Sequence, residues 1–260
     1  MTTRLRVGSL PYLNSEPFFA CFEGAELVSM MPSALGAVML RGELDAGLLS
    51  LADALALGEA VDLLPFGIAT LGATGSVHLW SHRPLDTLHG ATIGVTGETS
   101  TSVRILRLLL ERRHGVKDVR WTVLDGEADA VLLIGDEALR RRGRPSRFAC
   151  CTDLGSEWAA WTGLPAVFAA WVVRHTLSDP ARATLAAAVD RALTRGLAAL
   201  DAIGARRRDT GITEAETVAY LLNFIYRFGP AEQRAIAHFV GMGGLATGPP
   251  NPPHARGAPA

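Results

Sequence analysis

Two stretches of the chain repeat one pattern, and this repeat limits the possible fold more than any other feature of the sequence. Residues 42–49 (GELDAGLL) and 126–133 (GEADAVLL) are identical at six of eight positions and begin 84 residues apart. The first apolar strand expected in each half, around Val7 and Ile93, recurs after a nearly equal 86 residues. Short matches between segments rich in Ala and Leu arise by chance, so the agreement of the two spacings carries the inference. It favours two similar lobes with the same order of elements.

Short apolar runs, typical of buried strands, alternate with periodic helical segments through the first two thirds of the chain. Strands are expected at residues 5–10, 27–30, 45–49, 61–69, 77–80, 91–95, 119–123, 130–134, 148–152 and 164–173. Longer amphipathic helices are expected afterwards, at residues 179–203, 213–228 and 230–240. Because alternating strands and helices are typical of α/β proteins, the sequence predicts an α/β fold with two lobes.

The chain is expected to cross between the lobes twice, near residues 81–84 and 168–173. Lobe one then comprises residues 1–83 and 172–245, and lobe two comprises residues 84–171. The tail, residues 246–260, is rich in Gly, Pro and Ala. We predict that it is disordered, because it lacks the apolar surface that would order it. A small ligand is expected in the cleft between the lobes.

Composition excludes several classes of protein. The net charge of −1 over 260 residues gives no reason to expect a nucleic-acid partner or an anionic membrane surface. No apolar run reaches the roughly 18 residues of a membrane-spanning helix, and Pro11 and Asn14 interrupt any signal-peptide core. The three cysteines, Cys21, Cys150 and Cys151, form no CxxC pair and are odd in number, which favours reduced thiols and a cytoplasmic location.

The common cofactor and catalytic motifs are missing from the sequence. It contains no GxGxxG, GxxxxGK[ST], HExxH or GxSxG pattern. His78 and His82 lie on one face of an expected strand, but no third ligand at a suitable spacing accompanies them. We therefore expect a protein that uses no metal and no cofactor, and acts through polar side chains, helix ends and the reactivity of its ligand.

Four consecutive hydroxyl residues, Thr99, Ser100, Thr101 and Ser102, precede the helix expected from Val103. Backbone N–H groups at the start of a helix, with hydroxyls beside them, bind anions without a lysine. A helix cap needs only one hydroxyl, so four in a row exceed a structural requirement. This pattern predicts a pocket for a carboxylate or a phosphate.

Further polar residues follow the carboxyl ends of other expected strands, where ligands of open α/β sheets bind. They are Asn14, Ser50 and Asp136, with Ser15 next to Asn14 and Ser76 at the start of another strand. Each of them alone is typical of a helix cap or a turn. Together they would surround the same cleft.

Several segments taken together resemble the chorismate dehydratases of the futalosine route to menaquinone. They are YLNS (residues 12–15), TSTSV (99–103), LLIGDEAL (132–139) and DLGSEWAAWTGLPAVFAAW (153–171), and the resemblance extends over most of residues 5–240. Ser100 departs from the arginine expected there, and Ala166 departs from a bulky aromatic residue. The resemblance implies a two-lobed fold like that of type-2 periplasmic binding proteins. It also implies loss of water from chorismate to give 3-[(1-carboxyvinyl)oxy]benzoate, without a cofactor.

The resemblance and the pattern of polar residues together assign roles in the cleft. Asn14 and Ser76 would be catalytic and face the reacting carbons. The substrate-binding residues would be Ser15, Ser50, Thr99, Ser100, Thr101, Ser102 and Asp136. A neutral amide is a poor base, so the hypothesis has Asn14 orient the hydroxyl or a water and makes the enolpyruvyl carboxylate of the substrate the proton acceptor.

Three alternatives stay open at this point. The first is a non-catalytic solute receptor, which would have this fold. The second is a sister enzyme that acts later in the pathway on a dehypoxanthine-futalosine-like substrate. The third is a regulatory ligand-sensing domain. The oligomeric state is left open by the sequence.

Overall fold

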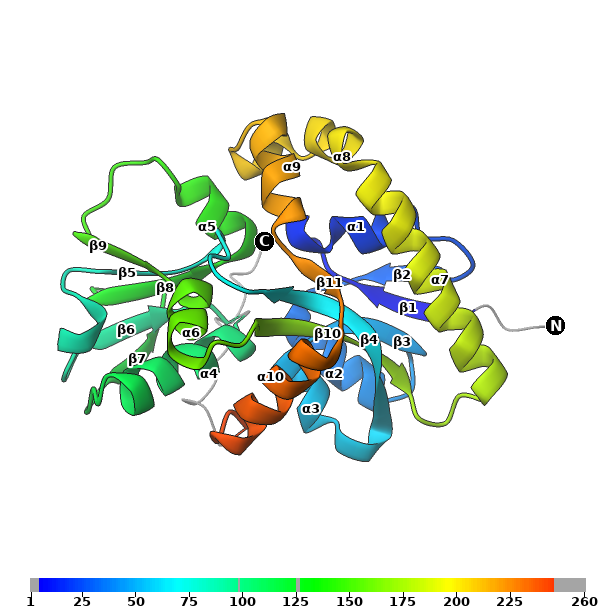
Figure 1. Cartoon of the computed structure of the whole chain (residues 1–260), viewed down its shortest axis with the longest axis horizontal. Helices are drawn as coiled ribbons and strands as arrows, with labels where there is room; N and C mark the ends of the chain where they lie inside the picture. Colours follow the sequence, from blue (N-terminus) through cyan, green and yellow to red (C-terminus); the bar gives the residue numbers. More distant parts are fainter. Residues whose placement is uncertain (1–4, 98, 125–126, 246–260) are drawn as a thin grey trace, which may run out of the picture.

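The computed structural model describes residues 5–97, 99–124 and 127–245. These residues form two sheets that lie side by side along the long axis of the molecule (Figure 1). The first sheet has the order β11 (Ile225–Arg227), β4 (Val61–Thr70), β10 (Ala166–Arg174), β3 (Ala46–Ser50), β1 (Arg6–Ser9) and β2 (Glu26–Ser29). The second has the order β7 (Arg120–Val123), β6 (Thr92–Val95), β8 (Ala130–Ile134), β5 (Val77–Ser81) and β9 (Cys150–Asp153). The predicted disorder of residues 246–260 lies outside the described residues.

Helices cover both sheets. They are α1 (Glu16–Phe19), α2 (Pro32–Leu40), α3 (Leu51–Ala56), α4 (Thr101–Leu108), α5 (Gly135–Arg141), α6 (Leu154–Thr162), α7 (Asp179–Ala198), α8 (Leu200–Arg206), α9 (Glu214–Leu222) and α10 (Pro230–Gly241). Short 3₁₀ turns are η1 (Leu13–Ser15), η2 (Gly58–Ala60), η3 (Leu85–Thr87) and η5 (Arg208–Thr210), and a π-helical turn, η4 (Leu109–Arg113), extends α4. None of the helices in the described residues is long and apolar enough to cross a bilayer.

The sequence repeat has the same structural role in both lobes. β1 lies between β2 and β3 and pairs in parallel with both, and β6 pairs in the same way with β7 and β8. The aspartates of the repeat, Asp45 and Asp129, each accept a hydrogen bond from the first backbone N–H of the strand alongside, at Arg6 and Thr92. The expected pair of similar lobes is confirmed at the level of individual contacts.

The two crossings between the sheets come earlier than the expected boundaries at residues 83 and 171. β5 pairs antiparallel with β8 and β9, so residues 77–81 lie in the second sheet. β10 pairs antiparallel with β3 and β4, so residues 166–174 lie in the first. The chain therefore changes lobe between β4 and β5 and again between α6 and β10. An apolar run predicts a strand but not its partners, which is why both boundaries are misplaced by about one strand.

The C-terminal helices also differ from the expectation. The helix expected at residues 179–203 is broken at Ala199, which has φ −113° and ψ 23°. The helix expected at residues 213–228 ends at Leu222, and residues 225–227 form the edge strand β11. β11 pairs with β4, and the Tyr226 ring packs edge-on against Phe18. Pairing with a distant strand thus overrides the local helical pattern.

One apolar cluster continues from the second lobe into the first. It includes Ile93 and Leu79 of the second sheet together with Ala170 of β10 and Phe239 of α10. At its centre the buried Trp158 of α6 donates a hydrogen bond to the Pro165 carbonyl, at 3.1 Å. This cluster therefore packs the two lobes against each other across their seam.

Candidate functional site

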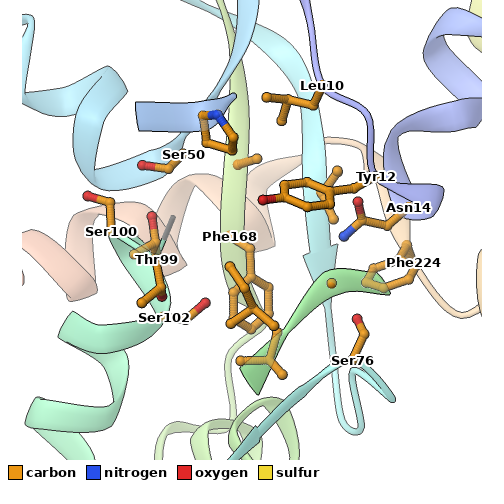
Figure 2. Close-up of a pocket in the computed structure, with 17 residues that line it drawn as sticks. Leu10, Tyr12, Asn14, Ser50, Ser76, Thr99, Ser100, Ser102, Phe168 and Phe224 are labelled. Atoms are coloured by element: carbon orange, nitrogen blue, oxygen red, sulfur yellow. The ribbon is translucent and has the colours of Figure 1, made fainter. Parts of the chain in front are cut away.

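A cavity of about 630 Å³, including its open mouth, lies where the two lobes meet (Figure 2). Its lining residues come from the strand ends and helix starts of both lobes: Leu10, Tyr12, Asn14, Pro32, Ser50, Ile68, Ser76, Val77, Thr99, Ser100, Thr101, Ser102, Ile134, Gly135, Phe168, Ala169 and Phe224. None of these side chains carries a formal charge at neutral pH. The cavity therefore combines apolar and aromatic walls with hydroxyl and amide groups, and it suits a small polar molecule.

Seven of the nine residues predicted to form the site line this cavity, and two do not. Ser15 is fully buried, and its hydroxyl donates to the backbone carbonyls of Leu10 and Tyr12, so it closes the turn η1 and does not face a ligand. Asp136 accepts a hydrogen bond from the Leu13 N–H at 2.9 Å and forms an ion pair with Arg207. Both were predicted from their place after a strand, but backbone groups or distant charged groups satisfy their side chains.

Asn14 lies in η1, which follows directly from β1. Figure 2 shows its amide directed into the cavity, between Tyr12, Phe224 and Ser76. Within the described residues its side chain forms no hydrogen bond. The short turn therefore presents an amide with its donors and its acceptor available to a ligand.

Ser76 faces the cavity from the other lobe, immediately before β5. Its hydroxyl is 2.7 Å from the Tyr220 hydroxyl, and either oxygen can be the donor. Burial raises the pKa of Tyr220 well above its usual range, so the phenol keeps its proton. The two hydroxyls form a buried pair that can pass a hydrogen bond to a molecule in the cavity.

Ser76 is held in place by an anchored turn. The Thr74 hydroxyl accepts hydrogen bonds from the N–H groups of Ser76 and Val77 and donates to the Asp153 carboxylate at 2.8 Å. Asp153 also accepts from the N–H groups of Thr74 and Gly75. Burial alone would raise the pKa of Asp153, but the hydrogen bonds from His78, from backbone N–H groups and from Thr74 outweigh it and lower that pKa to about 2. His78 is thus engaged with Asp153, at 3.3 Å, where the chain crosses between lobes.

The depressed pKa of Asp153 predicts acid-sensitive stability. A carboxylate with a pKa of about 2 when folded and about 3.8 when unfolded contributes on the order of 2 kcal/mol above pH 4, and loses it as the pH falls from about 4 to 2. We expect Asp153→Asn to lower the free energy of unfolding by about 2 kcal/mol at pH 7 and to flatten its slope between pH 4 and 2. Denaturant titrations at several pH values measure both. The exposed Asp86, changed to Asn, serves as the control; equal pH slopes in wild type and Asp153→Asn would contradict the assignment.

The four consecutive hydroxyls divide into two pairs. Ser100 donates to the Asp53 carboxylate at 2.7 Å, and the Thr101 hydroxyl accepts from the Ala52 N–H at 3.0 Å, which joins α4 to α3. Among the described residues, the buried Thr99 hydroxyl has no hydrogen-bond partner, and no bond is formed by the Ser102 hydroxyl. Thr99 and Ser102, at the start of α4, therefore remain available to an anionic group in the cavity.

Two charged side chains, Asp53 and Arg104, bind the hydroxyl residues at this end of the cavity from behind, and neither is itself a lining residue. Ser50 caps α3 and donates to Asp53, so Asp53 binds the hydroxyls of both Ser50 and Ser100. Arg104, one turn along α4, donates to the carbonyl and the hydroxyl of Ser100. Ser100, which stands in place of an expected arginine, thus lies between a carboxylate and a guanidinium.

The sequence did not single out several residues of the site. Tyr12 and Phe168 lie inside segments that carried the family resemblance, but no spacing or chemical pattern marked them. Tyr220 and Phe224 belong to a stretch expected to be one helix, and no local signal could have placed them beside Ser76. Gly135, with φ +58°, faces the ring of Tyr12, and a Cβ there would lie 3.1 Å from it. In the described residues, no three His, Cys, Asp or Glu side chains gather as a metal site would require.

Comparison with known proteins assigns the chain to a family. Residues 5–244 match the family model described as menaquinone biosynthesis. The chain belongs to this family. A chorismate dehydratase of Thermus thermophilus is 31% identical over 92% of the chain and 94% of its own length. A 1,4-dihydroxy-6-naphthoate synthase of Streptomyces coelicolor is 31% identical over 57% of the chain and 55% of its length.

Solved structures show that this member of the family has the predicted fold. Protein AF1704 of Archaeoglobus fulgidus superposes with a TM-score of 0.74 at 17% identity, covering 92% of the chain and 96% of that protein. The periplasmic aliphatic sulphonate binding protein SsuA of Escherichia coli gives a TM-score of 0.62 at 15% identity, with 95% of each chain covered. The expected two-lobed periplasmic-binding-protein fold is confirmed, and the family places the protein in menaquinone biosynthesis.

Proposed function

We propose that this protein is a cytoplasmic hydro-lyase that converts chorismate into 3-[(1-carboxyvinyl)oxy]benzoate and water. The proposal rests most on the cavity, where an amide and a buried hydroxyl pair face free hydroxyls at the start of α4. Its similarity to a chorismate dehydratase over nearly the whole length supports this choice of substrate.

The proposed reaction removes the proton from C3 and the hydroxyl from C4 of the chorismate ring. The electrons of the C3–H bond form the new ring double bond as the C4–O bond breaks, and the proton and the hydroxide leave as one water. The product ring is aromatic, so much of the driving force comes from the substrate. The protein has to bind the dianion, exclude water and polarise the departing hydroxyl.

The proposed roles follow from where the groups lie. Thr99 and Ser102, with the N–H groups at the start of α4, would bind one carboxylate. Phe168 and Phe224 would enclose the ring and exclude water. Asn14 would orient the C4 hydroxyl, while the Ser76–Tyr220 pair would donate a hydrogen bond to it as it leaves. Since no lining residue in the described part of the chain is a carboxylate or a histidine, we assign the proton at C3 to the enolpyruvyl carboxylate of the substrate.

The direct test is to mix the purified protein with chorismate and to follow the mixture by mass spectrometry. We expect a product lighter than chorismate by one water, with the ultraviolet spectrum of a substituted benzoate. A non-catalytic receptor would instead be protected against heat by chorismate without forming product, and that outcome would refute the proposed reaction.

A second candidate is the sister reaction later in the pathway. It is favoured by the partial similarity to a 1,4-dihydroxy-6-naphthoate synthase. The same mass measurement with a dehypoxanthine-futalosine-like substrate distinguishes the two. The chorismate reading is preferred because that similarity extends over 57% of the chain, against 92% for the chorismate dehydratase.

A further inference from the structure

A buried ion-pair network joins the two lobes beside Asn14. Asp136 lies in the first turn of α5, directly after β8 of the second sheet. Its carboxylate accepts a hydrogen bond at 2.9 Å from the backbone N–H of Leu13, which belongs to η1 of the first lobe. Leu13 immediately precedes Asn14. One side chain of the second lobe therefore holds the turn of the first lobe that presents the amide to the cavity.

Arg207 completes the network from the segment between α8 and η5. It donates to the other carboxylate oxygen of Asp136 and, at 2.8 Å, to Glu16, the first residue of α1. Its Nε donates to Asp209 at 3.0 Å. The side chains of Arg207 and Asp136 are 13% and 10% exposed. Asn14 is thus held on both sides: through the Leu13 N–H by Asp136, and through the Glu16 carboxylate by Arg207.

The energetics of this network argue against a purely stabilising role. Burial raises the pKa of Asp136, and the Leu13 N–H and Arg207 offset this only in part. Buried ion pairs often contribute little net stability, because desolvation consumes most of the attraction. Residues on both sides of this contact line the cavity. They are Ile134 and Gly135, which precede Asp136 in the second lobe, and Asn14, which follows Leu13 in the first.

We propose that Asp136 and Arg207 are positioning residues that hold η1 so that Asn14 is aligned with the second lobe. The role in turnover rests on the proposed function. Alignment of the amide depends on contact between the lobes, because the Leu13 N–H donates to Asp136 across the seam.

The test compares four single variants and one double variant. Asp136→Leu removes both contacts, whereas Asp136→Asn keeps an oxygen for the Leu13 N–H and loses the charge. Arg207→Met removes the guanidinium. Arg208→Met is the matched control, since Arg208 pairs with Glu214 on the exposed surface next to it. The measurements are kcat and KM for chorismate, and hydrogen exchange of a peptide covering residues 12–19.

We expect kcat to fall about 100-fold in Asp136→Leu and Arg207→Met and about tenfold in Asp136→Asn, with KM changed less than about threefold, because a small misplacement of a reacting group has effects of this size. Exchange of the peptide should be faster in these variants and unchanged in Arg208→Met. The double variant Asp136→Asn/Arg207→Met should be no slower than Arg207→Met alone, since the two act as one unit.

Two results would overturn the proposal. One is unchanged exchange in Asp136→Leu and Arg207→Met; the other is a wild-type kcat in Asp136→Asn and Arg207→Met. If Asp136→Leu does not fold, the comparison of Asp136→Asn with Arg208→Met decides the question. A wild-type protein that leaves chorismate unchanged would refute the proposed function alone, because the exchange measurements need no turnover and still test the contact.

Discussion

Asn14→Ala is expected to lower kcat for the dehydration of chorismate by about 10³-fold while the dissociation constant of chorismate changes by less than about threefold. The amide is directed into the cavity and forms no hydrogen bond with the described residues, so it is available to the reacting part of the ligand. Loss of one donor aimed at developing charge typically costs 10²–10³ in kcat. One carboxylate would be held elsewhere, at Thr99 and Ser102, so binding should survive. Rapid-quench turnover and calorimetric titration measure the two quantities.

Asn14→Asp provides the matched variant, because it keeps the size of the side chain and replaces the amide donor with a negative charge. We expect it to be inactive and also to bind the chorismate dianion more weakly, since like charges repel in a cavity where no cation is among the described lining residues. Near-normal turnover in Asn14→Ala would refute the catalytic assignment. An equal loss of binding and of turnover would show that Asn14 serves only to bind the substrate.

The features that the sequence predicted correctly are mostly local. Asp45 and Asp129 repeat because each bonds the strand alongside within its own lobe, so the sequence repeat reflects a repeated contact. The run of hydroxyl residues 99–102 likewise marks a local feature, the start of helix α4 at the cavity. Sheet membership of β5 and β10 could not be predicted, because it is decided by strands far away in the chain.

The site residues divide in the same way. Asn14 and Ser76 follow or precede strands at the seam, and their side chains remain directed into the cavity. Asp136 has the same local setting, yet Leu13, 123 residues away in sequence, engages its carboxylate. Tyr220 reaches Ser76 from 144 residues away. Sequence position placed a polar side chain near the cavity, and distant partners determined whether it faces a ligand.

Gly196→Ala is expected to destabilise the protein by about 3 kcal/mol and lower its melting temperature by about 6–12 °C. Gly196 lies in α7 where that helix packs on α1, and a Cβ there would overlap the Pro17 carbonyl oxygen and lie 2.7 Å from its carbonyl carbon. Alanine improves helix propensity by about 1 kcal/mol, but a clash with backbone atoms cannot be relieved by a rotamer change. At about 2–4 °C per kcal/mol for a chain of this size, calorimetry resolves the effect readily.

Gly36→Ala tests the same substitution without the clash. Gly36 lies inside α2, and a Cβ there would meet no atom of the described residues within 4 Å, so we expect a gain of up to about 1 kcal/mol. Opposite signs for the two variants would show that Gly196 is required by the contact between α7 and α1. Because α1 directly follows the turn that carries Asn14, Gly196→Ala should also lower kcat, while Gly36→Ala should not. A stabilising effect at both positions would contradict the close approach of α7 to Pro17.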